Sequence, residues 1–297
     1  MNIDLVDLRL FKNIADCGNL TRGAEKSCLS PPSASARIKS LEQETGQQLL
    51  VRGNKGISLT SSGERLLRQA QLVLRQMDFL KQEMMNGEAG HIRIFANTTA
   101  VTEFLPELLA RFLSCRKGVT VDLQERLTKD ILRAVADGTA DLGIMSGEAE
   151  PAGLEAIKFS TDRLMLAVPE NHVLTRRDRV ALYETLGFEH IALHEGSTLL
   201  DFLRRQMHRN GFDQILRVQV RSFEAMCRMV EAGAGVGVVP ESAARRHAQT
   251  MGIELLELVD EWAVRDRFVV IRDREALPGS ANALIDLLVQ EGLGGKA

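Results

Sequence analysis

The pattern of apolar and polar positions predicts three helices within the first 46 residues. In a first run, apolar residues recur at steps of three and four positions, and the run ends near Gly18. A second, shorter run covers Thr21–Cys28, and a third covers Ser33–Thr45. A short helix followed closely by a longer one, both supported by an earlier helix, is typical of a helix-turn-helix.

The third predicted helix has clear start and stop signals. Ser30 can cap its first free amide groups, and the two prolines that follow lack only donors that would be unpaired in any case. Gly46 can end the helix in a left-handed conformation. Ala34, Ile38 and Leu41 fall on one face, which is suited to packing. The opposite face, which we expect to enter a groove, carries Ser33, Ser35, Arg37, Lys39 and Ser40.

A hairpin is predicted directly after the third helix. Residues 48–52 and 57–59 have the short apolar pattern of strands, and the Gly53–Gly56 turn between them contains glycines that can adopt positive φ. A hairpin in this place makes the helix-turn-helix winged. Arg52 and Lys55 lie beside or within the turn, where phosphates of the DNA backbone are their natural partners.

Positive charge is concentrated in the same region. The whole chain of 297 residues has a formal net charge of -3, whereas residues 20–75 hold nine Lys or Arg against four Glu. A basic segment that coincides with a helix-turn-helix indicates nucleic-acid binding. The alternative is the solvated polar face of an ordinary small helical domain. The hairpin that follows favours the nucleic-acid interpretation.

A long helix is predicted from Thr60 to about Glu88, with Thr60 as its cap and Gly87 and Gly90 as breakers. Its apolar positions follow steps of 4, 3, 4, 3 and 4 residues, which is the heptad spacing of a coiled coil. The residues of this apolar row are Leu66, Ala70, Val73, Met77, Leu80 and Met84. An isolated helix about 40 Å long cannot hide such a row. We therefore predict a dimer, and packing of the row on the chain's own later part is the alternative.

From residue 91 onward the pattern changes to an α/β layout. Short apolar runs alternate with helical segments, and about 200 residues are enough for two lobes of roughly 100 residues each. The predicted strands cover residues 91–96, 119–123, 142–145, 164–168, 190–193, 235–239 and 268–271.

Several classes of chemistry have no signal in the sequence. The four cysteines have no metal-ligand spacing, the six histidines are scattered, and no window has the pattern of a phosphate loop or a nucleophile elbow. The Gly233–Gly237 stretch precedes an apolar strand instead of following one, so it does not fit a dinucleotide site. No window reaches the roughly 18 apolar residues of a membrane span, and the first residues form an amphipathic helix instead of a leader. We expect no catalytic residue, no metal and no cofactor, in a cytoplasmic protein with reduced thiols.

Residues 3–67 resemble the DNA-binding domain of LysR-type transcriptional regulators. The residues that carry the resemblance are Leu8, Phe11, Ile14, Ala15, Asn19–Glu25, Leu29, Ser30, Pro32, Ser35, Ile38–Glu42, Gly46, Leu49, Leu50, Arg52, Leu59, Thr60, Gly63 and Glu64. The sequence departs from the family pattern inside the third helix, where Pro31 replaces a common glutamine and Ala36 a common arginine, with Arg37 one position later. Arg37 either forms a bidentate contact to guanine or holds a phosphate, and the residues leave both roles open.

The resemblance implies that the chain binds double-stranded DNA as a dimer, or as a dimer of dimers. Two reading heads on a twofold axis can contact successive major-groove faces about 34 Å apart. Together with the polar face and the hairpin, the resemblance assigns DNA binding to Thr21, Arg22, Ser30, Pro32, Ser33, Ser35, Arg37, Lys39, Arg52 and Lys55.

Residues 91–297 resemble the effector-binding domain of the same family, which is similar to periplasmic binding proteins of type 2. The segments Asp137–Ile144 and Glu231–Pro240 carry this likeness. It implies two α/β lobes joined by two crossover strands, with a ligand cleft between them. The expected domains are residues 1–59 for the winged helix-turn-helix, 60–90 for the linker and dimerisation helix, 91–161 with 267–297 for lobe one, and 162–266 for lobe two.

Three predicted helix starts would face the cleft, where free amides and the helix dipole suit an anionic effector. Thr99 and Thr128 match, by position, the residues that most often contact effectors in the family. The candidate effector-binding residues are Thr98, Thr99, Thr128, Ser197, Thr198 and Phe202. For each hydroxyl, plain helix capping is the alternative. The resulting hypothesis is a DNA-binding regulator controlled by a small molecule. The alternatives are a solute-binding module or enzyme with a vestigial helix-turn-helix, and a nonspecific DNA binder.

Overall fold

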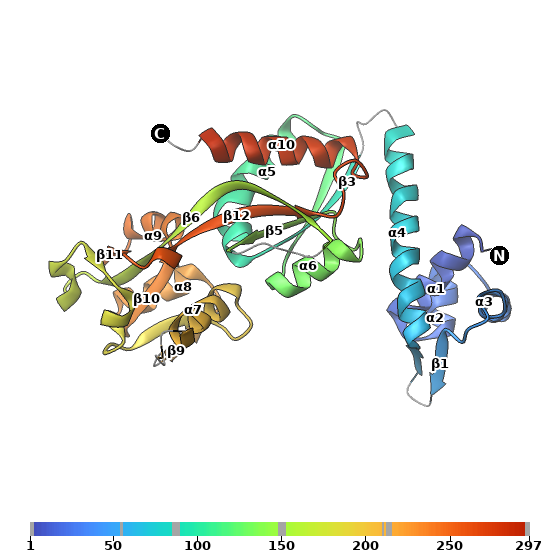
Figure 1. Cartoon of the computed structure of the whole chain (residues 1–297), viewed down its shortest axis with the longest axis horizontal. Helices are drawn as coiled ribbons and strands as arrows, with labels where there is room; N and C mark the ends of the chain where they lie inside the picture. The colour runs from blue at the N-terminus through green and yellow to red at the C-terminus, as the bar shows by residue number, and fades with distance from the viewer. Residues whose placement is uncertain are drawn as a thin grey trace.

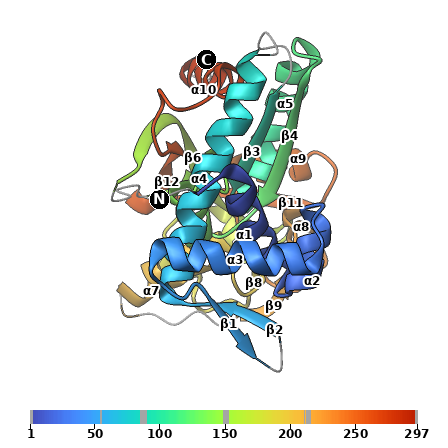
Figure 2. The same ribbon diagram turned by 90° about the vertical axis from the view of Figure 1, so that its right-hand side faces the viewer.

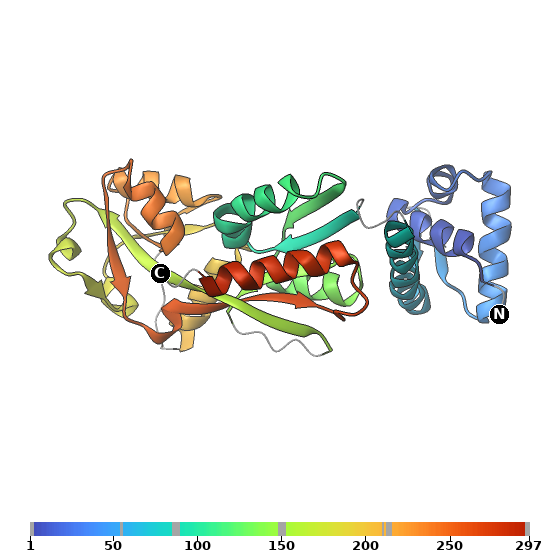
Figure 3. The ribbon, with the colours of Figure 1, turned by 90° about the horizontal axis from the view of Figure 1, so that it is seen from above.

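The computed structural model describes residues 3–53, 56–84, 90–147, 153–209, 211 and 216–294. A helical reading head (residues 3–53 and 56–60) lies at one end, a single long helix stands beside it, and an elongated unit of two α/β lobes forms the rest (Figure 1). Seen from above, the reading head and the two lobes follow one another along the long axis of the molecule (Figure 3).

The reading head contains the three predicted helices: α1 (Leu5–Cys17), α2 (Leu20–Lys26) and α3 (Pro31–Thr45). The local signals act as expected, because Ser30 caps α3 by accepting a hydrogen bond from Ser33 N at 3.3 Å and Gly46 ends it at φ 65°. α2 begins one residue earlier than predicted, with the Asn19 side chain as its cap, and ends before Cys28.

The predicted hairpin is also present, as strands β1 (Leu50–Gly53) and β2 (Gly56–Leu59). Two contacts fix it to the helices. The Glu42 carboxylate accepts from the amides of Leu49 and Leu50 at 2.8 and 3.1 Å, and Ile57 N donates to the Gly18 carbonyl at 2.8 Å. Gly56 has φ 120°, and a Cβ there would lie 2.7 Å from the Gly18 oxygen, so only glycine fits this approach.

The long helix α4 (Ser61–Met84) follows directly. Thr60 caps it, because its Oγ1 accepts from Gly63 N at 3.0 Å. Its predicted end near Glu88 lies outside the described residues. The first half of α4 packs along α1 of the reading head, where Leu8, Ala70 and Leu74 form a small buried cluster.

Lobe one (described residues 90–147, 153–163 and 264–294) is built on a mixed sheet. Three parallel strands pair with one another, and two antiparallel strands complete the sheet. Its elements are β3 (Gly90–Ala96), the π-helical turn η1 (Ala100–Phe104), α5 (Leu105–Ser114), β4 (Val119–Glu125), α6 (Thr128–Ala136), β5 (Leu142–Ser146), β6 (Glu155–Pro169), β12 (Val264–Ile271) and α10 (Gly279–Gly294). α5 and α10 cover one face and α6 the other (Figure 1).

Lobe two (described residues 164–209, 211 and 216–263) repeats this plan around one hydrophobic core. Its elements are η2 (Val173–Arg176), β7 (Arg179–Val180), η3 (Leu182–Thr185), β8 (His190–Leu193), α7 (Thr198–Arg209), β9 (Leu216–Val220), α8 (Phe223–Glu231), β10 (Val236–Pro240), α9 (Glu241–Ala248), β11 (Ile253–Leu258) and η4 (Glu261–Ala263).

β6 and β12 connect the two lobes. The first part of β6 pairs with β12, and from Leu164 onward β6 pairs with β10 and β11 instead. The strands therefore form one continuous path, β4-β3-β5-β12-β6-β10-β8-β9, that passes through both lobes. The predicted α/β layout with two crossover strands is confirmed.

Candidate functional site

α3 is the outermost helix of the reading head. It runs across the end of the molecule, with the β1–β2 hairpin beside it (Figure 2). Its apolar side packs inward through Ala34, Ile38 and Leu41, which leaves the polar side open. Of the residues assigned to DNA, Ser35 is half-buried, and those exposed are Thr21, Arg22, Ser30, Pro32, Ser33 and Lys39.

Arg37 does not extend from this open side as predicted. Its guanidinium lies against α1, where Nη1 donates to Asp7 Oδ1 at 2.6 Å and to Asp4 Oδ2 at 3.1 Å. The reason is helical position, because Arg37 precedes the inward-facing Ile38 and flanks α1. Asp4 also caps α1, and the pKa of Asp4 is lowered by its bond from the Asp7 amide and by Arg37. The exposed Ala36 takes the outward position instead.

The wing residues assigned to phosphates are only partly described. Arg52 lies in β1 opposite Ile57, which places its backbone near the tip of the hairpin. The side chain of Arg52 and all of Lys55 lie outside the described residues. Their contacts with DNA stay a prediction.

The apolar row of α4 is divided in the structure. Ala70 is 1% exposed beneath the chain's own reading head, so its assignment to a dimer seam is wrong. Leu66 is half-buried against the same reading head, and its assignment stays a prediction. Val73, Leu80 and Met84 are 44, 50 and 77% exposed. The division arises because α1 covers only the first half of α4.

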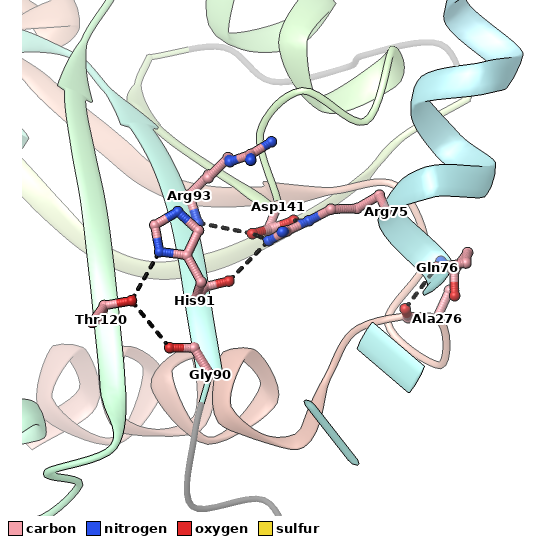
Figure 4. A network of polar contacts seen from close by, with 8 residues as sticks. All are labelled: Arg75, Gln76, Gly90, His91, Arg93, Thr120, Asp141 and Ala276. Atoms are coloured by element: carbon pink, nitrogen blue, oxygen red, sulfur yellow. Dashed lines mark hydrogen bonds and ion pairs between the residues drawn. The ribbon is translucent and has the colours of Figure 1, made fainter. Parts of the chain in front are cut away.

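A different face of α4 docks on lobe one (Figure 4). Arg75, on α4, forms a buried pair with Asp141: its Nε donates to Oδ1 at 2.7 Å and its Nη2 donates to Oδ2. The same Nη2 donates to the carbonyl of His91 at 2.9 Å, and Asp141 Oδ2 also accepts from the amide of Arg93 at 2.8 Å. The side chains of Arg75 and Asp141 are 6 and 2% exposed, so this is a charge-balanced pair buried between two parts of the chain.

Close packing surrounds this pair. The Phe79 ring lies 4.5 Å from the Arg75 guanidinium carbon, and Gln76 Nε2 donates to the Ala276 carbonyl at 3.4 Å. Gly138 has φ 69°, and a Cβ there would lie 2.3 Å from the Leu72 side chain. The alternative, that α4 packs on the later part of the chain, thus holds for this face and not for the apolar row.

A cleft of about 450 Å³ opens between the lobes. One side comes from the ends of β3 and β4 and the start of α6, and the other from the loop after β8 and the start of α7. Its lining residues are Thr98, Glu125, Arg126, Leu127, Asp130, His194, Gly196, Thr198 and Arg221. Side chains of both signs line it.

Two predicted effector residues, Thr98 and Thr198, line this cleft. Thr98 is already engaged, because its Oγ1 donates to Glu125 Oε1 at 2.6 Å. Thr99 is buried, and Thr128 begins α6 at the cleft edge, next to Leu127. The effector role of these residues remains a prediction.

Of the two remaining effector residues, Ser197 is buried and Phe202 is half-buried. Ser197 is 2% exposed and its Oγ has no hydrogen-bond partner in the structure. Phe202 packs edge-on against Trp262, with ring centroids 5.8 Å apart, and the Arg265 guanidinium carbon lies 5.2 Å from its ring. Phe202 thus lies beside a cationic group that the sequence did not reveal, and its role in effector binding stays a prediction.

Two charged clusters between the lobes escaped sequence reasoning. Glu103 of η1, whose side chain is 2% exposed, pairs with Arg246 of α9 at 3.0 Å. Asp162 of β6 pairs with Arg265 and Arg267 of β12. The partners are more than a hundred residues apart, and the only local signal is a pair of arginines alternating within a strand.

The cysteines differ in exposure: Cys227 is buried, Cys17 is half-buried, and Cys28 and Cys115 are exposed. Cys17, Cys28, Cys115 and Cys227 are all free thiols. Burial raises the pKa of Cys227 to about 11, so it stays protonated near neutral pH and is a poor nucleophile. Among the described residues, no cluster of His, Cys, Asp and Glu could hold a metal ion. No helix in the described ranges has the length and apolar character needed to span a bilayer.

Comparisons with known proteins agree on both halves of the chain. Residues 5–64 match the bacterial regulatory helix-turn-helix protein family of lysR type, and residues 85–292 match the LysR substrate binding domain. The chain is 28% identical over 295 residues to the HTH-type transcriptional regulator YnfL of Escherichia coli (strain K12), covering 97% of this chain and 99% of YnfL. It is 29% identical over 253 residues to a probable RuBisCO transcriptional regulator of Porphyra purpurea, covering 80 and 78% of the two chains.

Solved structures show the same fold. Full-length OxyR from Pseudomonas aeruginosa matches with a TM-score of 0.76 at 23% identity, covering 98% of this chain and 94% of that chain. Full-length CbnR in complex with its target DNA matches with a TM-score of 0.66 at 21% identity, covering 97 and 99%.

Proposed function

The chain belongs to the LysR family of DNA-binding transcriptional regulators with an effector-binding domain. We propose that it binds a two-part operator as a dimer and that a small anionic effector controls this binding. Members of this family are regulators, not enzymes. We propose the domain division given by the sequence, with residues 1–59 as the DNA-binding domain, 60–90 as the linker helix and 91–297 as the effector-binding domain, in a cytoplasmic protein.

The observation that carries DNA recognition is the open polar side of α3 next to a hairpin fixed to the same core. Residues on the start of α3 reach base edges, and Arg22, Lys39 and the wing arginine Arg52 hold phosphates. The bond that the Glu42 carboxylate accepts from the Leu49 amide sets the angle between helix and wing. Because helix and wing are held in a fixed orientation, they can bind DNA with little loss of conformational entropy.

The exposed part of the α4 row supports dimerisation. Val73, Leu80 and Met84 follow steps of 7 and 4 residues along one side of the helix, and Met77 lies between them. Exposed apolar side chains at heptad spacing gain burial from a second copy of the same helix. We propose a dimer through this half of α4, which pairs further into a dimer of dimers.

We propose that the effector binds in the cleft between the lobes. Its size suits a small metabolite, and Thr98 and Thr198 line it from opposite lobes with the free amides of helix starts nearby. The Arg75–Asp141 pair joins α4 to lobe one. A movement of lobe two relative to lobe one would therefore change the position of α4 in the dimer, and with it the distance between the two reading heads. Each tenfold bias between arrangements requires about 1.4 kcal/mol of differential effector affinity.

The test is operator selection by the full-length protein from a pool of random duplexes. We expect enrichment of paired half-sites separated by about one helical turn, with affinity that falls steeply as salt rises. Equal binding to selected and scrambled duplexes would support the nonspecific binder instead. Turnover of a small molecule without operator preference would support the solute-binding enzyme.

A further inference from the structure

A compact polar cluster lies where the two crossover strands pass between the lobes. Arg265 of β12 stands opposite Asp162 of β6 in the antiparallel register, and Arg267 stands opposite Ser160. Alternate residues of a strand point to the same face, so these four side chains share one face of the strand pair. Arg265 Nη2 donates to Asp162 Oδ2, and Arg267 Nη2 donates to Asp162 Oδ1 at 3.0 Å.

The guanidinium of each arginine packs against an aromatic ring, and the two rings come from different lobes. The ring of Phe104, from η1 of lobe one, lies 4.7 Å from the Arg267 guanidinium carbon, and the ring of Phe202, from α7 of lobe two, lies 5.2 Å from that of Arg265. Thr98 precedes η1 and Thr198 begins α7, and both line the interlobe cleft. Phe104 and Phe202 therefore belong to segments whose first residues line the cleft.

The charges of the cluster do not balance. Asp162, Arg265 and Arg267 have side chains that are 1, 4 and 14% exposed. In the described part of the chain, Asp162 is the only carboxylate that forms an ion pair with either arginine. The cluster thus carries one positive charge in excess on side chains that are largely removed from water, which is costly in a protein interior. Burial lowers the pKa of Arg265, and the neighbouring Arg267 lowers it further, as expected of an undercompensated cation.

The cluster also has unused hydrogen-bond donors. The Nε atoms of Arg265 and Arg267 and the Oγ of Ser160 are buried and have no hydrogen-bond partner in the structure. Native proteins leave few such groups unpaired, and a bound ion or ligand can satisfy those that the protein itself does not. Three donors beside an excess positive charge select an acceptor that carries negative charge. A cation would be repelled, and a neutral carbonyl would leave the charge unbalanced.

We propose that Arg265 and Arg267 bind the anionic oxygen group of the effector, and that this effector is a small organic carboxylate. The inference rests on the proposed function and makes it more specific, because it moves the anion from the helix starts to the crossover strands. An anion held there contacts strands shared by both lobes and lies between Phe104 and Phe202. Its binding therefore favours the arrangement in which the two lobes are close.

The test uses the full-length protein and its single tryptophan, Trp262, which packs against Phe202. Tryptophan fluorescence and thermal unfolding are followed during titration with sodium acetate, succinate, benzoate and sulfate. Sodium chloride controls for ionic strength, and the corresponding amides serve as uncharged counterparts. We expect at least one carboxylate, and not its amide, to shift both signals beyond the effect of chloride.

Variants then locate the site. Arg267→Gln should weaken binding of that carboxylate at least tenfold, and Ser160→Ala should weaken it several-fold. Asp162→Asn should strengthen it several-fold, because it removes the only paired carboxylate, whereas a purely structural role predicts a loss. Arg163→Gln is the matched control: Arg163 lies on the same strand β6, is 37% exposed and pairs with Glu257, so its effect should stay within twofold.

Three outcomes would overturn the proposal. These are no anion acting beyond chloride, sulfate acting without any carboxylate, and full binding retained in Arg267→Gln or Ser160→Ala. If Arg267→Gln does not fold, the opposite signs expected for Ser160→Ala and Asp162→Asn still decide. Operator selection in the absence of any anion is read separately, so a failed anion test leaves DNA recognition standing.

Discussion

Two buried arginine–aspartate clusters join parts of this molecule, and they differ in how completely their groups are paired. At the junction of α4 and lobe one, Arg75 meets one carboxylate, Asp141, and each partner also bonds a backbone group. At the crossover between the lobes, two arginines share Asp162 and keep unpaired Nε atoms. A fully paired, charge-balanced contact favours a fixed joint. An underpaired one favours a joint that responds to a ligand.

The largest expected loss of stability follows from removing one partner of the fixed joint between α4 and lobe one. Asp141→Ala leaves Arg75 buried without its partner, and we expect a loss of about 3–5 kcal/mol in the free energy of unfolding. The measurement is urea denaturation of the full-length protein followed by circular dichroism. Asp137→Ala is the control, because the partners of Asp137, Arg68 and Arg133, are 41 and 79% exposed and the loss should be below about 1 kcal/mol.

The same experiment sharpens the contrast between the joints. Arg75→Gln should destabilise strongly, since it leaves Asp141 buried and unpaired. Arg267→Gln removes an excess charge, so the free energy of unfolding should change by less than about 1 kcal/mol. Equal losses in the two variants would mean that the joints do not differ in kind.

The next effect concerns the face of α4 that neither joint uses. Val73→Glu combined with Leu80→Glu places charge on the exposed apolar row, and we expect the dimer to dissociate. Operator affinity should fall by about two orders of magnitude, because the second reading head no longer adds to the first. Sedimentation velocity measures the mass, and Gln71→Glu, on the opposite side of α4, is the control. An unchanged mass in the double variant would rule out this row as the interface.

A smaller expected effect is that the stability of lobe two depends on pH. Burial lowers the pKa of His172, His190 and His247 below the ordinary value of 6.5, so the unfolded chain takes up protons more readily than the folded lobe. Their stabilisation is complete above pH 6.5 and is lost as pH falls below it. Between pH 7 and 5 we expect the stability of lobe two to fall, reported by Trp262 fluorescence during urea denaturation. His190→Gln should flatten this dependence, and an unchanged slope would contradict it.

The smallest effect concerns Arg37. Its pairs with Asp4 and Asp7 are partly exposed, so Arg37→Ala should change stability by less than about 1 kcal/mol. With its guanidinium on α1, we expect a modest and equal loss of affinity on all operators, as for a phosphate contact. Lys39→Ala should instead reduce the salt slope of binding by about one. A loss confined to particular base pairs in Arg37→Ala would restore it as a base-reading residue.

Features that depend on residues close in the sequence were predictable, unlike the two joints. Helix ends were predictable because Ser30, Thr60 and Gly46 act on neighbours within a few residues. The alternating strands and the cleft helices followed from periodicity and from the family resemblance. These features depend on local physics or on a shared fold, and either source is visible in a single sequence.

The misses all involve contacts between distant segments. Arg37 was expected to face outward because nothing in α3 reveals where α1 places Asp7. Ala70 fits a heptad, yet the helix that covers it lies some sixty residues earlier in the chain. Arg75 and Asp141 are 66 residues apart, and Asp162 and Arg265 are 103 apart. Only the folded chain shows which charges are buried and with whom.

The crossover also determines where the chain enters and leaves lobe two. β6 passes into lobe two at Leu164 and β12 returns from it at Val264, and Val264 sits directly across the ladder from Arg163. Entry and exit are therefore neighbours in space, although a hundred residues of chain separate them. The ends of the segment 164–263 lie side by side, so lobe two of a relative could replace this segment at the same two positions. Such a chimera would change the lobe-two half of the ligand site and leave the DNA sequence preference unchanged.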